Sequence, residues 1–191
     1  LKNAGEKKLT EAFIKKNTDN ECKTKAEYEK HVREQLEKDK KNSVGSELLS
    51  KVSGDSKLKK TPKLQLKAAK KDVEQNYEQM ASQYGMDVDR LIKAYGMDEK
   101  SYQAMVKNSA KESVKLHLVA HAIAKEEGIR LSSSDYDQRL KEFKESTGLS
   151  EKQFKKQAGS SYEDYAKENN FEEYFFQEKV GQFLVDKATA K

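Results

Sequence analysis

The chain contains few of the residues that crosslink a fold or interrupt a helix. Its one cysteine, Cys22, excludes an internal disulfide and leaves the redox compartment open. Its one proline, Pro62, permits long uninterrupted helices elsewhere. No apolar run approaches the ~18 residues that a membrane span needs, and no signal peptide is visible. Because Leu1 is not an initiator methionine, we expect a processed or excised piece of a longer protein.

Apolar residues are also scarce, at 35% of the chain against 37% charged residues. Such a chain can bury apolar side chains in strips between helices but not in one thick centre. Disorder is the alternative at low hydrophobicity. The apolar residues are, however, strongly periodic, and 8% of all residues are aromatic. We therefore expect an elongated fold with projecting arms.

The net charge of +5 is carried almost entirely by lysine, since only Arg33, Arg90, Arg130 and Arg139 are arginine. Recognition of bases and phosphates favours the planar guanidinium fork over the lysine point charge. We therefore interpret the lysines as a solvated helical surface and expect no direct nucleic-acid partner. The densest basic stretch, residues 57–71, has the charge to steer an anionic partner.

A helical phrase occurs twice in the chain, at a constant offset of 63 residues. Repeats of this size are whole supersecondary units. Each copy predicts a helix, a glycine stop, a short capped helix, a second glycine stop and a further helix. The matched positions are Gly85, Leu91, Gly96, Asp98 and Tyr102 in the first copy and Gly148, Phe154, Gly159, Ser161 and Tyr165 in the second.

Elsewhere in the chain the apolar residues recur at helical spacing. No segment alternates apolar and polar residues for long enough to be a strand. We predict an all-α fold, an elongated multi-helical body with two helical arms. One domain is expected over residues 1–191. Its parts are an N-terminal strap at 1–23, a linker helix at 24–60, a first arm at 61–112, a central helix at 113–131, and a second arm with the final helix at 132–191. Thr24 with Glu27, and Asp87, Asp98 and Ser132, are the expected helix caps.

One segment resembles the C-terminal domain of trigger factors. Residues 113–129, Ser-Val-Lys-Leu-His-Leu-Val-Ala-His-Ala-Ile-Ala-Lys-Glu-Glu-Gly-Ile, are similar to the central helix of that domain and its glycine stop. Three earlier segments resemble, in the same order, segments that precede this central helix in trigger factors: residues 9–17, 24–36 and 61–62. The resemblance covers about residues 9–188.

The resemblance implies an all-helical chaperone body with two arms, related in fold to parvulin-type periplasmic chaperones. It implies ATP-independent binding of unfolded or nascent polypeptides between the arms, with no cofactor. The parent protein would carry a prolyl isomerase domain and a ribosome-docking domain, neither of which is in this chain. A cytoplasmic location follows, while the basic, lysine-rich composition fits an exported or cell-surface relative as the alternative.

We expect the arms to present a flexible apolar surface to these polypeptides. Aromatic residues and methionines at helical spacing usually belong to the buried core, but a thin three-helix arm cannot bury all of those in this chain. Methionine is polarizable and tyrosine is amphipathic, so both tolerate varied partners. The predicted client-binding residues are Tyr77, Met80, Tyr84, Met86, Tyr95, Met97, Tyr102 and Met105 in the first arm, and Phe143, Phe154, Tyr162 and Tyr165 in the second.

No pattern in the chain predicts catalysis. His117 and His121 stand one helical turn apart, but a zinc protease would need glutamate where Leu118 stands, and no third ligand is evident nearby. We therefore expect packing or solvation of these histidines and no metal. Helix capping explains the serines at 132–134. The competing interpretation of the whole chain is a helical scaffolding adaptor that binds one folded partner.

Overall fold

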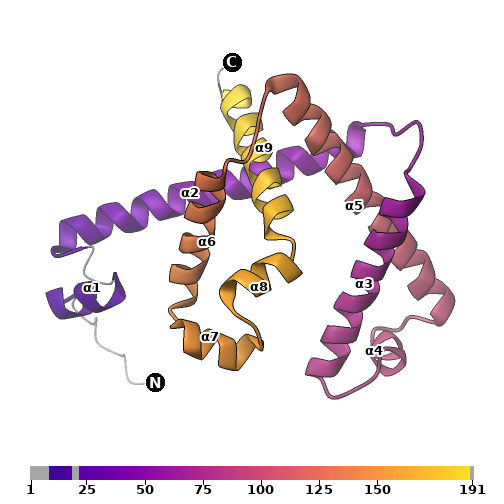
Figure 1. The fold of residues 1–191 in the computed structure, drawn as a ribbon, viewed down its shortest axis with the longest axis horizontal. Coiled ribbons are helices and arrows are strands. Elements are labelled where there is room, and N and C mark those ends of the chain that lie inside the picture. Colours follow the sequence, from indigo (N-terminus) through magenta and orange to yellow (C-terminus); the bar gives the residue numbers. More distant parts are fainter. Residues whose placement is uncertain (1–8, 19–21, 190–191) are drawn as a thin grey trace, which may run out of the picture.

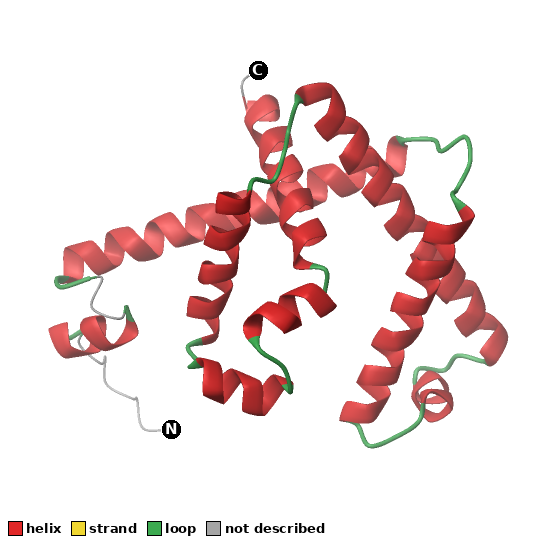
Figure 2. Ribbon diagram, in the orientation of Figure 1, coloured by secondary structure: helices red, strands yellow, loops and turns green. Residues whose placement is uncertain are grey.

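The computed structural model describes residues 9–18 and 22–189, and within these ranges every regular element is a helix (Figures 1 and 2). The all-α prediction is confirmed. The described helices are α1 (Glu11–Asn17), α2 (Lys25–Asp55), α3 (Lys63–Gln83), α4 (Val88–Ala94), α5 (Glu99–Glu127), α6 (Ser133–Thr147), α7 (Glu151–Ala158), α8 (Tyr162–Glu168) and α9 (Phe171–Thr189).

Helix α2 runs along most of the long axis of the molecule, and α5 and α9 pack against it to form the body (Figure 1). With 31 residues, α2 is about 46 Å long at 1.5 Å per residue. It begins at the predicted capping box. The Glu27 amide donates to Thr24 Oγ1 at 3.2 Å, and the Thr24 amide donates to Glu27 Oε2 at 3.0 Å. Two otherwise unpaired amides are thereby satisfied.

The first arm consists of α3, α4 and the N-terminal half of α5, and it projects to one side of α2 (Figure 1). The predicted caps are present: Asp87 accepts from the Arg90 amide at 2.8 Å, and Asp98 accepts from the Ser101 amide at 2.7 Å. Helix α5 continues without a break from the arm into the body. The expected boundary between residues 112 and 113 therefore falls within one rigid helix.

The second arm consists of α6, α7 and α8, and it projects to the same side of α2 as the first (Figure 1). The sequence repeat has a backbone counterpart. Gly85 and Gly148 have φ values of 65° and 62°, and Gly96 and Gly159 have 72° and 82°. The copies diverge after the second glycine, because α8 has 7 residues against 29 in α5.

Among the described residues, the core is divided into four small clusters and has no single centre. One lies in the body and contains Leu49, Ala120 and Val180, while the others lie at the base of the first arm, near its tip, and where the second arm meets α9. The accessible surface is 14594 Å², against about 9,300 Å² for a compact protein of this mass. The predicted strip-like core is therefore present. None of the described helices combines the length and apolarity needed to cross a bilayer.

Candidate functional site

Three of the predicted client-binding residues are core residues. Tyr102, Phe154 and Tyr162 are buried, with Tyr162 only 1% exposed. The Tyr162 ring stacks on Phe154 at 3.7 Å between centroids, and its hydroxyl donates to the Leu149 carbonyl at 3.1 Å. The structure therefore places these three predicted residues in the core of the arms and not on their surface.

The tip of the first arm leaves two tyrosines in solvent. Tyr84 is 64% exposed and Tyr95 is 56% exposed. Each is the C-cap of its helix, α3 or α4, and is followed by a glycine with positive φ. This turn directs the chain away from the helix and leaves the cap side chain outside the arm core. The Tyr95 hydroxyl reaches Met80 Sδ at 3.6 Å, which keeps one methionine beside the exposed rings.

The other predicted residues of the first arm are half-buried beneath these tyrosines. Tyr77, Met97 and Met105 pack on the small cluster of Ile92, Tyr102 and Val106. The Tyr77 and Tyr102 rings meet edge to face at 5.3 Å. The tip thus has a mixed surface, with part of each apolar side chain packed and part accessible, and Met86 is likewise half-buried.

In the second arm Phe143 occupies the middle of an aromatic group. Its ring lies 4.8 Å from Phe171 and 6.1 Å from both Phe154 and Tyr165, measured between centroids. Phe143 and Tyr165 are half-buried. Phe143 therefore joins the buried part of the second arm to the groove that opens beside it.

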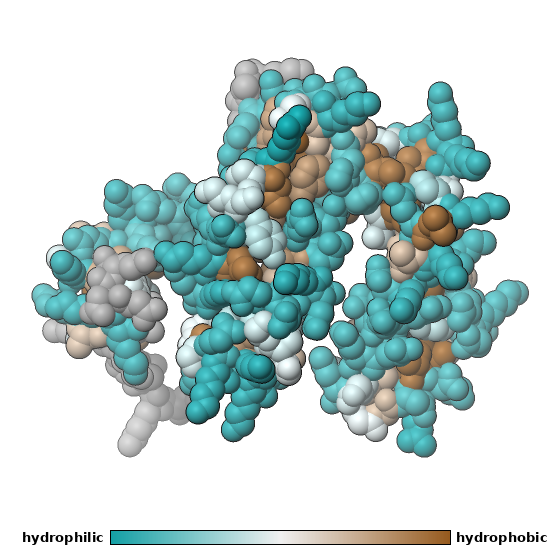
Figure 3. All heavy atoms as spheres, in the orientation of Figure 1, coloured by the Kyte–Doolittle hydropathy of each residue, from teal (hydrophilic) through white to brown (hydrophobic). Residues whose placement is uncertain are grey.

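That groove is formed by the inner side of α6, the start of α9 and the facing side of α2. It has a volume of about 460 Å³, and its apolar lining comes from Phe143, Phe171, Tyr174 and Phe175. A second groove of about 520 Å³ continues from it toward α5, where Leu116 lines it. The two grooves share Asp39, Arg139 and Tyr174. Figure 3 shows a mainly hydrophilic face on which hydrophobic side chains gather over α5 and α9 and along the first arm.

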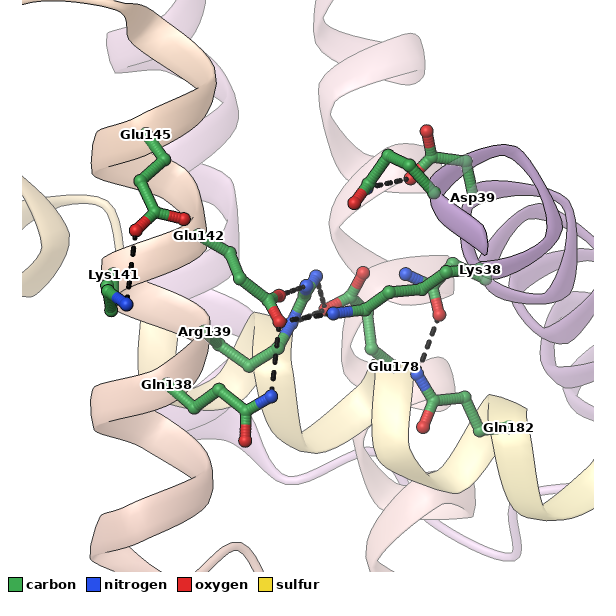
Figure 4. A network of polar contacts seen from close by, with 11 residues as sticks. Lys38, Asp39, Gln138, Arg139, Lys141, Glu142, Glu145, Glu178 and Gln182 are labelled. Atoms are coloured by element: carbon green, nitrogen blue, oxygen red, sulfur yellow. Dashed lines mark hydrogen bonds and ion pairs between the residues drawn. The ribbon is translucent and has the colours of Figure 1, made fainter. Parts of the chain in front are cut away.

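A polar network between α2, α6 and α9 fixes the floor of the grooves (Figure 4). Arg139 donates through Nε to Glu178 at 3.0 Å and also contacts Glu142. Lys38 of α2 reaches the same Glu142 carboxylate. Burial acts to raise the pKa of Glu142, but the hydrogen bonds from Lys38 and Arg139 outweigh it and lower the pKa below its ordinary value. The carboxylate is therefore held in its charged form.

Comparison with known proteins gives the family. The sequence pattern described as "Bacterial trigger factor protein (TF) C-terminus" matches residues 23–186. The chain belongs to this family. Family membership supports a role as a chaperone in protein folding, which agrees with the arms and grooves described above.

The curated relatives are whole trigger factors. The chain is 27% identical to the trigger factor of Staphylococcus saprophyticus over 147 residues, which cover 75% of this chain and 34% of the relative. It is 27% identical to that of Bacillus subtilis over 150 residues, 76% of this chain and 35% of the relative. A shorter match to that of Halothermothrix orenii reaches 35% identity over 68 residues, 36% of this chain and 16% of the relative. The chain thus spans about a third of the length of these relatives, and no solved structure matches it significantly.

Three of the aromatic residues that line the groove of about 460 Å³ were not predicted from the sequence, namely Phe171, Tyr174 and Phe175. Tyr174, Phe175 and Phe176 are consecutive, and three consecutive residues of a helix point in three different directions. Tyr174 is 57% exposed while Phe175 is buried. The run itself therefore indicated that one aromatic ring must face solvent, and this was the available signal.

The two central histidines acquire a partner that sequence spacing did not indicate. Glu173, in the first turn of α9, lies 2.9 Å from His117 Nδ1 and 3.0 Å from His121 Nε2. The sequence shows no acidic partner near the histidine pair, and the fold brings this carboxylate beside it from 52 residues after His121.

Proposed function

We propose that the chain binds nascent or unfolded polypeptide segments on the inner surfaces of its two arms, without nucleotide. The observation that carries the proposal is the exposure of Tyr84, Tyr95 and Tyr174 on a member of a chaperone family. Tyr84 and Tyr95 offer rings at the tip of the first arm, and Tyr174 of α9 offers one where the two grooves meet.

The chemistry of these side chains suits varied and weakly bound clients. A tyrosine ring provides apolar contact area at low conformational cost, and its hydroxyl remains hydrated when no client is bound. Methionine beside it adapts to different shapes. Binding surfaces of this kind repack around different partners and therefore favour promiscuity over tight selection.

The polar groups of the grooves complement the apolar ones. Asp39, Arg139 and Glu142 stand beside Phe143 and Tyr174 in the same groove. An extended client brings its own backbone donors and acceptors, and these require partners when they leave water. A groove that pairs rings with both signs of charge supports main-chain contacts without demanding a particular client sequence.

We further propose that this chain works as part of a longer trigger factor. By resemblance, the parent carries a prolyl isomerase domain and contacts the ribosome through a domain outside these residues. We infer that the chain itself supplies no isomerase activity and that the parent is cytoplasmic. The alternative is an exported or cell-surface trigger-factor-like protein, to which the lysine-rich composition is suited.

An aggregation assay on several clients tests the proposal. Three unrelated proteins are denatured chemically and diluted into buffer with the chain, with and without ATP. We expect the chain to reduce light scattering for all three, at similar molar ratios and equally with and without ATP. Retention of one native partner in pulldowns, with no protection of any denatured client, would instead establish the adaptor function and overturn this proposal.

A further inference from the structure

Apart from the two grooves, the body contains a cluster of two histidines and one glutamate where the start of α9 packs against α5. His117 and His121 stand on one face of α5, and Glu173 of α9 reaches both of them. The imidazole rings lie 4.3 Å apart between centroids. The three residues can each present one ligand atom so that all three atoms lie within 4.8 Å of one another.

The geometry resembles that of a site with three protein ligands. Zn²⁺ binds imidazole nitrogen and carboxylate oxygen at about 2.0–2.2 Å, so neighbouring ligand atoms around a tetrahedral ion lie roughly 3.3–3.5 Å apart. The nitrogen–oxygen distances here, 2.9 Å from His117 Nδ1 to Glu173 Oε1 and 3.0 Å from His121 Nε2 to Glu173 Oε2, are slightly shorter than that edge and involve the two different carboxylate oxygens. Small rotations of the partly exposed rings would bring both nitrogens and one carboxylate oxygen to the separations that one ion requires.

The surroundings orient these three side chains. Gln177 donates to Glu173 Oε1 at 2.7 Å and so fixes the direction of the carboxylate. Phe176 stacks on the His121 ring at 4.4 Å between centroids and restricts its rotation. Outer partners of this kind are typical of metal ligands, whose carboxylates are themselves hydrogen-bonded.

Ions also have access to the group. The side chains of His117 and His121 are 36% and 48% exposed, while that of Glu173 is 20% exposed. The rings thus reach solvent, while the carboxylate is set deeper between the helices.

We propose that His117, His121 and Glu173 bind one divalent transition-metal ion, Zn²⁺ foremost, with water completing the coordination. Imidazole with one carboxylate is a donor set that suits Zn²⁺ and Co²⁺, whereas Mg²⁺ and Ca²⁺ prefer oxygen ligands. The ion would join α5, which carries the first arm, to the start of α9, which follows the second. It would brace the two arms relative to each other without taking part in client binding.

Direct titration of the metal-free chain tests this site. Isothermal titration calorimetry with ZnCl₂ at neutral pH should give one saturable site per chain. Co²⁺ should produce the visible absorption bands of a low-symmetry site, and Zn²⁺ should displace them. Mg²⁺ should give neither signal. The melting temperature should rise with Zn²⁺ concentration, because a ligand that binds only the folded chain stabilises it.

Variants distinguish this site from other ways of binding the ion. His117→Ala, His121→Ala and Glu173→Gln should each abolish the saturable site, and Gln177→Ala should weaken it by about 10–100-fold. The matched control is His31→Ala, which removes the only other histidine, an exposed residue of α2. Cys22→Ser is a second control. Both controls should bind as the parent chain does.

The folding of each variant is measured separately, so that a variant that does not fold is not mistaken for one that has lost the metal site. Each metal-free variant is first checked by circular dichroism and thermal melting, and Glu173→Gln preserves side-chain shape if an alanine variant does not fold. The absence of saturable Zn²⁺ binding by the parent chain would overturn the proposal. So would binding that survives in the folded His117→Ala and Glu173→Gln variants, or binding that disappears in His31→Ala or Cys22→Ser.

Discussion

Gly45 of α2 and Gly181 of α9 meet backbone to backbone where these helices cross. A Cβ atom added to Gly45 would lie 2.7 Å from the Gly181 carbonyl carbon, and one added to Gly181 would lie 2.8 Å from the Gly45 carbonyl carbon. Neither helix has room for a side chain at this point. The crossing belongs to the most extensive helix pair of the structure and adjoins the body cluster of Leu49 and Val180.

Substitution at this crossing should destabilise the body. Gly45→Ala places a methyl group against backbone that cannot rotate away, and overpacking of this kind costs about 1–3 kcal/mol. Thermal melting measures the effect. Gly54→Ala is the matched control in the same helix, since nothing lies within 4 Å of its added Cβ. It should be neutral or stabilising by up to about 1 kcal/mol. Equal melting temperatures for the two variants would contradict the close crossing.

The aromatic residues of the second arm and of the adjoining start of α9 should divide into core and surface. Tyr162→Ala removes a ring that is 1% exposed, and truncation of a buried aromatic residue costs about 3–5 kcal/mol. Tyr174→Ala, at 57% exposure, should change the unfolding free energy by less than about 1 kcal/mol. Denaturant unfolding compares the two. A larger loss for Tyr174→Ala than for Tyr162→Ala would reverse the assignment of core and groove.

Glu142 should make stability depend on pH in the acid range. Its folded-state pKa is lowered from the ordinary value of 4.5, so its contribution is present above about pH 4.5 and is lost as the pH falls through the folded pKa. The difference in unfolding free energy between the parent chain and Glu142→Gln should therefore shrink as the pH falls below about 4.5.

The control for this prediction removes an exposed carboxylate from the same helix. Glu145 forms an exposed ion pair with Lys141, at 3.3 Å, and exposed pairs of this kind contribute little. Unfolding of Glu145→Gln should follow the parent chain across the same pH series. If the difference between the parent chain and Glu142→Gln stays constant down to about pH 3, the network does not hold α6 to α2 and α9.

Local signals in the sequence predicted the helices well, but they did not predict which side chains meet. The caps Thr24, Asp87 and Asp98 act within three residues of themselves, so their positions follow from the sequence alone. The burial of Tyr162 depends instead on Phe154 and Leu149 of the preceding segment folding back over it. Helical periodicity states that such a ring lies on an apolar face, but not whether another helix covers that face.

The same limit applies to contacts between distant segments. Glu173 meets His117 and His121 only because α9 returns to α5, and Gly181 meets Gly45 only because α9 crosses α2. A spacing of one helical turn revealed the histidine pair, whereas its third member had no local signal. The exposure of Tyr84 and Tyr95 was partly predictable from the local sequence. Each is followed by a glycine that ends its helix, and a side chain at such a turn is often left outside the core.

Site-specific photo-crosslinking tests the central claim, that the exposed aromatic residues of the first arm and of the grooves contact unfolded proteins. A photoreactive phenylalanine derivative replaces Tyr84 or Tyr174, or, as a control, the exposed Glu126 at the far end of α5. Each chain is irradiated with three unrelated proteins, in native and in denatured form. We predict crosslinks from positions 84 and 174 to all three denatured proteins, with few from position 126 and few to the native forms. Equal yields from all three positions, or crosslinks to one native protein only, would contradict the account.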